Sequence, residues 1–143
     1  MTIPQISVFV ENRAGQLAEI TKILAENGID MRAISIAEAS DYGVLRIITN
    51  EPERTASILV SNGIVLSMTP VLAVAVPDQV GGLAPVLSLL AEANIDIEYM
   101  YSLFTQKAGT AYMVFRVSDE AKFVALLETK GIQTVSREEL GIH

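Results

Sequence analysis

The chain has 143 residues, the length of one ordinary domain or of two small ones. Half of its residues are hydrophobic and 19% are charged, which excludes intrinsic disorder as the main state. The formal net charge of −7 argues against direct binding to nucleic acid or to an anionic membrane surface, because both select for positive charge.

The residue inventory also argues against several kinds of chemistry. The sequence contains no cysteine, so it has no thiol nucleophile, disulfide or cysteine-ligated metal. Its one histidine, His143, is the last residue, and the nearby pair Glu138-Glu139 has no metal-ligand spacing. No apolar run reaches the roughly 18 residues that span a bilayer, and the N-terminus has no signal-peptide pattern. We therefore expect a cytoplasmic protein without a cofactor, a metal or a membrane partner.

The hydrophobic pattern predicts six elements in the first half of the chain. Apolar residues at helical spacing and the glycines that follow them define two helices. Pro52 begins the second helix, where its missing N–H costs nothing. The apolar phase changes near Arg32-Ala33, which predicts a β-bulge there. The elements are a strand at 6–10, a helix at 14–27, strands at 29–39 and 44–49, a helix at 52–62 and a strand at 64–68.

An internal repeat extends this order to the second half. With an offset of 66, residues 8–30 align with residues 74–96 and share ten identities in 23 positions. Such self-similarity indicates two copies of one unit of about 70 residues, and we predict domains at 1–70 and 71–143. The second copy has strands near 72–76, 95–105, 111–117 and 132–136, and helices near 82–93 and 119–129.

The order β-α-β-β-α-β predicts an α+β fold in each copy, an antiparallel four-stranded sheet with both helices on one face. Val8 and Val10, with their counterparts Val74 and Val76, should face the helices. The opposite face has no helix and is too apolar for a free surface, so we expect it to pack against another copy or another protein.

The turn between the first strand and the first helix of each copy is the candidate ligand site. A helix N-terminus presents backbone N–H groups that can bind a carboxylate without a basic side chain. Gly15 and Gly81 leave room for a ligand near the backbone. Asn12 or Asp78 could accept a hydrogen bond from an ammonium group, which suits a zwitterionic α-amino acid. In the alternative interpretation, these residues only form the turn and cap the helix.

These residues resemble the ACT domain, a small βαββαβ ligand-sensing module. The resemblance rests on residues 11–17 and 25–31 and on their counterparts 77–83 and 91–97. It covers nearly the whole chain twice and implies two tandem ferredoxin-like ACT units without a fused catalytic domain. It also implies that an amino acid or related metabolite binds at an interface between ACT units and that the signal passes to a separate enzyme.

The two copies differ at the candidate contacts, so we expect non-equivalent sites. We favour the second copy, where Gly81-Gly82 opens more space and Asp78 is charged. An apolar lining from Leu17, Leu83, Ile34 and Met100 would favour a branched-chain or aromatic ligand. Tyr101 could contact the ligand, or it could serve only the packing of the copies. The predicted ligand-binding residues are Asn12, Ala14, Gly15, Gln16, Leu17, Ser35, Asp78, Val80, Gly81, Gly82, Leu83 and Tyr101.

The leading functional hypothesis is a non-catalytic regulatory protein that binds an amino acid, forms at least a homodimer and modulates a separate enzyme of amino acid metabolism. The alternative is a constitutive dimerisation or interaction subunit of a metabolic enzyme or regulator, with no small ligand of its own. An enzyme ranks lowest, because no positioned acid–base pair is visible. A role in gene expression would require a partner, given the net charge of −7.

Overall fold

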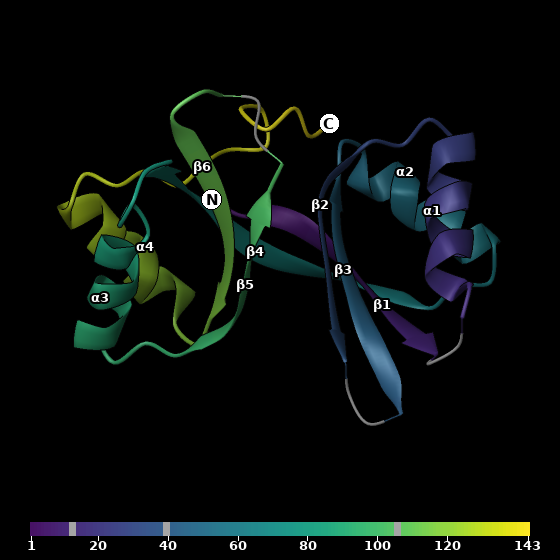
Figure 1. Cartoon of the computed structure of the whole chain (residues 1–143), viewed down its shortest axis with the longest axis horizontal. Helices are drawn as coiled ribbons and strands as arrows, with labels where there is room; N and C mark the ends of the chain where they lie inside the picture. Colours follow the sequence, from purple (N-terminus) through teal and green to yellow (C-terminus); the bar gives the residue numbers. More distant parts are fainter. Residues whose placement is uncertain (12–13, 39–40, 105–106) are drawn as a thin grey trace. The chain divides into compact units, whose positions relative to one another are not determined.

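The computed structural model describes residues 1–11, 14–38, 41–104 and 107–143 (Figure 1). They form two compact units, which we name after the repeats. The first-repeat unit is Pro4–Pro70 with Arg137–His143, and the second-repeat unit is Val71–Ser136 with Met1–Ile3. The division into domains 1–70 and 71–143 stays a prediction. The elements are β1 (Ile3–Glu11), α1 (Gln16–Glu26), β2 (Met31–Glu38), β3 (Tyr42–Thr49), α2 (Pro52–Ser61), β4 (Leu66–Pro77), α3 (Ala84–Glu92), β5 (Ile97–Leu103), β6 (Thr110–Val117) and α4 (Glu120–Thr129).

The first-repeat unit packs α1 and α2 against one face of its sheet (Figure 1). Strand β3 lies between β1 and β2 and pairs antiparallel with both. Alternate residues of each strand point to the helices, as the apolar pattern predicted. The buried cluster between sheet and helices comprises Ile6, Val8, Val10, Ile20, Leu24, Ile29, Leu45, Ile47 and Leu59.

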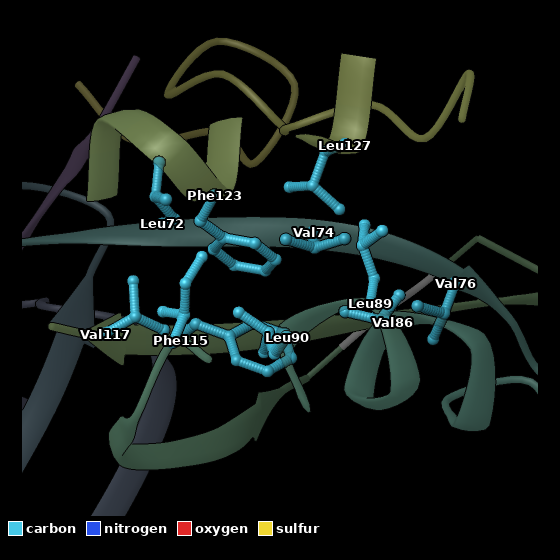
Figure 2. Packing of buried hydrophobic residues seen from close by; sticks show 11 residues of the cluster. Leu72, Val74, Val76, Val86, Leu89, Leu90, Phe115, Val117, Phe123 and Leu127 are labelled. Carbon is cyan, nitrogen blue, oxygen red and sulfur yellow. The ribbon is translucent and has the colours of Figure 1, made fainter. Parts of the chain in front are cut away.

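The second-repeat unit has the same plan, with β6 between β4 and β5. Its core lies between the sheet and the helices α3 and α4 (Figure 2). Phe115 of β6 meets Phe123 of α4 edge to face, with ring centroids 5.4 Å apart. Val74 and Val76 belong to this core, as expected. The α+β fold of two tandem βαββαβ units is therefore confirmed.

The four helices of the described residues all end in the same hydrogen-bonded motif. After α1, the Gly28 N–H donates to the Ala25 carbonyl at 3.2 Å and the Ile29 N–H donates to the Leu24 carbonyl at 3.0 Å. These two bonds define a Schellman motif, which requires a left-handed residue after the helix. Gly28 fills that position with φ 67°. The motif recurs at Gly63-Ile64, Asn94-Ile95 and Gly131-Ile132.

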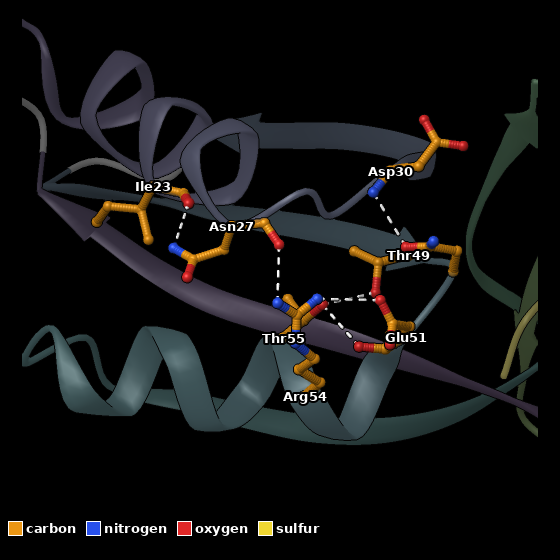
Figure 3. Close-up of polar contacts among 8 residues, drawn as sticks. Ile23, Asn27, Asp30, Thr49, Glu51, Arg54 and Thr55 are labelled. Atoms are coloured by element: carbon orange, nitrogen blue, oxygen red, sulfur yellow. Dashed lines mark hydrogen bonds and ion pairs between the residues drawn. The ribbon is translucent and has the colours of Figure 1, made fainter.

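Polar contacts join the end of α1 to the start of α2 (Figure 3). Arg54 donates to the Asn27 carbonyl at 2.9 Å and pairs with Glu51 at 3.1 Å. The buried Thr55 hydroxyl donates to the Glu51 carbonyl at 2.7 Å. A hydroxyl has one proton, so Thr49 must be the donor in its 2.9 Å contact with Thr55. These bonds fix the position of the start of α2 relative to the end of β3.

The predicted bulge is present in β2 and has a counterpart in β5. The register of β2 on β3 shifts between Met31 and Ala33, and that of β5 on β6 shifts between Ile97 and Tyr99. Each bulge adds one residue that changes the face of the strand, which reconciles the two apolar phases. The bulge in β2 is confirmed.

Several predicted boundaries differ from the structure. The strands expected at 64–68 and 72–76 are one strand, β4, which runs through Pro70 because proline is compatible with extended backbone. The strand expected at 132–136 is reduced to one bridge between Val74 and Thr134, since the chain turns at Arg137. The helix expected at 14–27 begins at Gln16, because Gly15 is left-handed at φ 90°.

The last seven residues, Arg137–His143, belong to the first-repeat unit, and we call them the strap. Two nitrogens of Arg137 donate to the two carboxylate oxygens of Glu53 at 3.2 and 3.3 Å. Arg32, the extra residue of the β2 bulge, donates to the Leu140 carbonyl at 3.1 Å. The strap thus returns the end of the chain to α2 and β2.

Candidate functional site

A pocket of about 430 Å³ opens at one end of the first-repeat sheet. It lies where β1 and β2 end and β3 begins, beside the first turn of α1. Its volume lies within the usual range of small-molecule sites, about 300–1,000 Å³. The lining residues are Val10, Glu11, Gln16, Leu17, Ile36, Glu38, Tyr42 and Gly43.

The missing side chain of Gly43 shapes the floor of the pocket. In the sheet register Gly43 lies between Val10 of β1 and Glu38 of β2. A Cβ atom at position 43 would lie 3.0 Å from Val10 Cγ2 and 3.4 Å from the Ala37 carbonyl oxygen. A larger side chain there would therefore occupy space beside the residues that line the pocket.

The start of α1 forms the wall of the pocket. Gly15 is the N-cap residue and has no side chain with which to cap the helix. The Gln16 carboxamide oxygen accepts a hydrogen bond from the Glu11 N–H at 2.6 Å, which ties the helix to the end of β1. The positive end of the helix dipole is therefore held beside the pocket.

The remaining lining residues make the pocket amphipathic. Glu11 and Glu38 are its only charged residues within the described part of the chain. Val10, Leu17 and Ile36 give it an apolar surface. Tyr42 is 47% exposed and meets Phe9 edge to face, with centroids 5.9 Å apart. The pocket can thus hold a small molecule that combines an aliphatic part with positive charge.

Comparison with known proteins places the chain in a family. The model of the ACT domain pair matches residues 1–142. The chain belongs to this family. Protein BT0572 from Bacteroides thetaiotaomicron has 35% sequence identity, with 99% of this chain and 96% of that chain covered and a TM-score of 0.89. A search of curated proteins gave no significant match.

Two more distant structures share the fold of this ACT pair. The regulatory subunit of aspartate kinase from Thermus thermophilus, in a ligand-free form, is 13% identical over 88% of this chain and 90% of that chain, with a TM-score of 0.63. The corresponding subunit from Thermus flavus is 15% identical over 90% of both chains, with a TM-score of 0.59.

The structure places the site residues predicted in the first ACT unit at different positions around the pocket. Gln16 and Leu17 line it, and Gly15 precedes them at the helix start. Ala14 is exposed. Ser35 pairs with Arg46 and lies on the helix-free face, since its neighbour Ile36 points to the pocket. Asn12 lies outside the described residues.

The predicted residues of the second ACT unit lie in a tight turn. The Gly82 N–H donates to the Gln79 carbonyl at 3.0 Å. A Cβ atom on Gly82 would be only 2.0 Å from the Pro77 carbonyl oxygen, so the turn requires glycine here whether or not a ligand binds. The Asp78 N–H donates to the Gly109 carbonyl at 2.9 Å, and Val80 is fully exposed.

The other predicted residues of the second ACT unit lie apart from that turn or in the core. Leu83 packs against the buried cluster. Tyr101 stacks on Tyr99 with centroids 6.4 Å apart, on the helix-free face. There Arg116 pairs with Glu98 at 3.2 Å. Whether any of these residues binds a ligand stays a prediction.

Sequence reasoning missed most of the pocket lining. Val10 was predicted only as core, and Ile36, Glu38, Tyr42 and Gly43 were not predicted to contact a ligand. One signal was available, because a glycine at the start of a strand leaves a gap in the row of side chains. The sequence does not give the register that places Glu38 opposite that gap.

The described residues contain no cluster of three or more acidic or histidine side chains that could hold a metal ion. Within the same residues, no helix is long and apolar enough to cross a membrane.

Proposed function

We propose that this ACT pair is a non-catalytic regulatory protein that binds an amino acid in the pocket of its first unit. The observation that carries the proposal is the juxtaposition of the α1 N-terminus, an apolar wall and two glutamates around one pocket. The helix start suits the ligand carboxylate, and a glutamate suits its ammonium group. The apolar surface from Val10 and Leu17 suits the aliphatic part of a side chain.

The regulatory part of the proposal draws on the family and its relatives. Two structures of similar fold are regulatory subunits of aspartate kinase. By analogy, this chain would modulate a separate enzyme of amino acid metabolism and would associate with further copies of itself. A ligand that prefers one packing of the units would shift the population toward that packing, which converts binding into a signal.

Thermal shift against the twenty amino acids tests the proposal, followed by calorimetry with the strongest ligand. At about 100 times its Kd, a ligand that binds only the folded state adds about 2.7 kcal/mol to stability. We expect a selective shift that Gly43→Val abolishes, because the new side chain would fill the floor of the pocket. Thr110→Val, at the matching position of Tyr42 in the second unit, is the control and should keep binding.

Two outcomes would count against the proposal. Unchanged affinity in Gly43→Val, with unchanged circular dichroism, would place the ligand elsewhere. If no amino acid stabilises the protein, the alternative of a constitutive interaction subunit gains weight. The exposed aromatic pair Phe9 and Tyr42 is the surface that would favour it, and Phe9→Ser should then weaken self-association or partner binding.

A further inference from the structure

We propose that the strap is a docking segment, which Arg32 and Glu53 hold on the first-repeat unit and which undocks as one piece while the rest of that unit stays folded. The inference goes beyond the proposed function and does not depend on it. A segment opens separately when polar contacts hold it and little apolar surface ties it to the core. Within the strap only Ile142 is buried, with 3% of its surface exposed. Undocking would therefore expose one apolar side chain and free two charged anchors.

The strap is a closed turn with a shape of its own. The Ile142 N–H donates to the Arg137 carbonyl at 2.9 Å, and the Gly141 N–H donates to the Glu138 carbonyl at 3.1 Å. These are the two bonds of a Schellman motif, which here closes a single turn. Gly141 fills the left-handed position with φ 66°. The internal bonds make the strap one structural piece.

Arg32 holds the carbonyl end of this turn. Its Nε donates to the Leu140 carbonyl at 3.1 Å, and its Nη2 makes a longer contact of 3.5 Å with the Gly141 carbonyl oxygen. The last carbonyls of a helical turn carry partial negative charge, so a guanidinium group stabilises them. A Cβ atom on Gly141 would lie 2.9 Å from Arg32 Nη2, so the close approach also requires glycine. Asp30 pairs with the same guanidinium group and orients it.

Two further contacts hold the two ends of the strap. At its start, Arg137 donates to both carboxylate oxygens of Glu53 in the first turn of α2. At its other end, the His143 N–H donates to the Asn50 carbonyl at 2.6 Å. Asn50 follows β3 and exchanges two hydrogen bonds with Asp30, which precedes β2. The strap thus docks on the junction between the end of β3 and the start of β2.

The second-repeat unit distinguishes the residues that serve the fold from those that serve the strap. Its junction keeps the same two hydrogen bonds, between Asp96 and Ser118. The repeat alignment and the strand register place Glu98 at the position of Arg32. Ala121 matches the other anchor of the strap. The anchors therefore belong to the first repeat alone, where both have partners in the strap.

Amide hydrogen exchange of the intact chain, resolved by NMR, tests the proposal. A single turn is unstable on its own, so the Ile142 and His143 amides exchange once the strap undocks. The amides of the central strand β3 report on unfolding of the whole unit, because β3 is paired on both sides. In the wild type the two strap amides should exchange together, at least about tenfold faster than those of β3.

Arg32→Gln is the decisive variant. It should speed exchange of the two strap amides by at least about tenfold, because it removes hydrogen bonds from a charged group, and leave β3 unchanged. Arg32→Lys keeps the charge without the planar donor fork, so its effect should be intermediate. Arg54→Gln is the matched control, because Arg54 also pairs with a carboxylate and a backbone carbonyl of this unit, at Glu51 and Asn27. It should not change the ratio of strap exchange to β3 exchange.

A charge reversal tests the second anchor. Glu53→Arg and Arg137→Glu each bring like charges together, and each should speed exchange of the strap amides severalfold. The double variant restores the ion pair in the opposite sense and should slow exchange again toward the wild-type rate. A general loss of stability would instead add up in the double variant.

Several results would overturn the proposal. Strap amides that exchange at the β3 rate in the wild type would show that the strap opens only when the whole unit unfolds. An equal increase at the strap and at β3 in Arg32→Gln would show that Arg32 stabilises the unit as a whole. Additive effects of the two charge reversals would show that their ion pair does not hold the strap. If Arg32→Gln does not fold, Arg32→Lys and the charge reversals decide by the same criteria.

Discussion

The two ACT units keep the same internal clamp and differ at the end of the sheet. In the first unit the Asp30 N–H donates to Asn50, and Arg54 donates to the Asn27 carbonyl. In the second unit the Asp96 N–H donates to Ser118 at 3.0 Å, and Lys122 donates to the Ala93 carbonyl at 2.8 Å. Different side chains make the same bonds, which shows that the clamp serves the fold.

At the pocket the two units diverge. Glu11, Gln16, Glu38 and Gly43 of the first unit line a cavity. Their counterparts in the second unit are Pro77, Gly82, Phe104 and Ala111, and Ala111 packs against the core. At these matching positions the first unit thus has two charged residues and the second unit has none.

The two hydrophobic cores should show the largest difference in stability between the units. Phe123 is fully buried against Phe115, whereas the matching residues of the first unit are Thr55 and Ile47. Phe123→Ala should lower the free energy of unfolding by about 3–5 kcal/mol, because it leaves a cavity. Urea denaturation followed by circular dichroism measures this loss. A loss below about 1 kcal/mol would mean that the second core closes around the gap.

At the corresponding position of the first unit, a substitution should lower stability because it removes a hydrogen bond. Thr55→Val keeps the volume and removes the acceptor of the Thr49 hydroxyl, which is buried. We expect a loss of about 1–3 kcal/mol, the cost of a buried polar group without a partner. The double variant Thr49→Val, Thr55→Val should recover part of that loss in the same denaturation experiment. Additive losses would show that the two hydroxyls do not act as a pair.

Substitutions at the ends of α1 and α3 should change stability with opposite signs. Gly28 and Asn94 occupy the same left-handed position of the Schellman motif, with φ 67° and 55°. Gly28→Ala should destabilise by about 1–2 kcal/mol, because a Cβ atom is disfavoured at positive φ. Asn94→Gly should be neutral or stabilise by a few tenths of a kcal/mol, by relieving the same cost. Calorimetric melting temperatures of the two variants provide the comparison, and equal signs would contradict it.

The strap belongs to the first unit alone. Its ion pair between Arg137 and Glu53 should have the smallest effect, a dependence of stability on pH. The hydrogen bond from Arg137, a backbone hydrogen bond and the charge of Arg137 lower the pKa of Glu53, against the small opposing effect of burial. A carboxylate with a lowered pKa stabilises the folded state above its unfolded pKa, and this contribution is lost as pH falls through the folded value.

Melting temperatures of the wild type and Arg137→Ala between pH 7 and pH 3 test this dependence. The difference between the two proteins should shrink as pH falls below the ordinary glutamate value of about 4.5. Glu53→Gln removes the titrating group and serves as the control, since the stability of this variant should lack the pH dependence that Glu53 causes. A constant difference across the range would show that Arg137 acts on stability through other contacts.

The sequence by itself determined the features that depend on neighbouring residues. The repeat, the alternating strand faces and the glycines after three helices were all readable, because side-chain periodicity and left-handed backbone are local properties. The bulge at Arg32-Ala33 was readable as well, since one extra residue shifts the apolar phase.

Only the tertiary structure decided which distant residues meet. The pocket depends on the register that sets Val10, Gly43 and Glu38 in one row across three strands. The strap joins Arg137 to Glu53 across 84 residues and Leu140 to Arg32 across 108. No local pattern encodes such contacts, because they arise from the global pairing of strands and the packing of the chain ends.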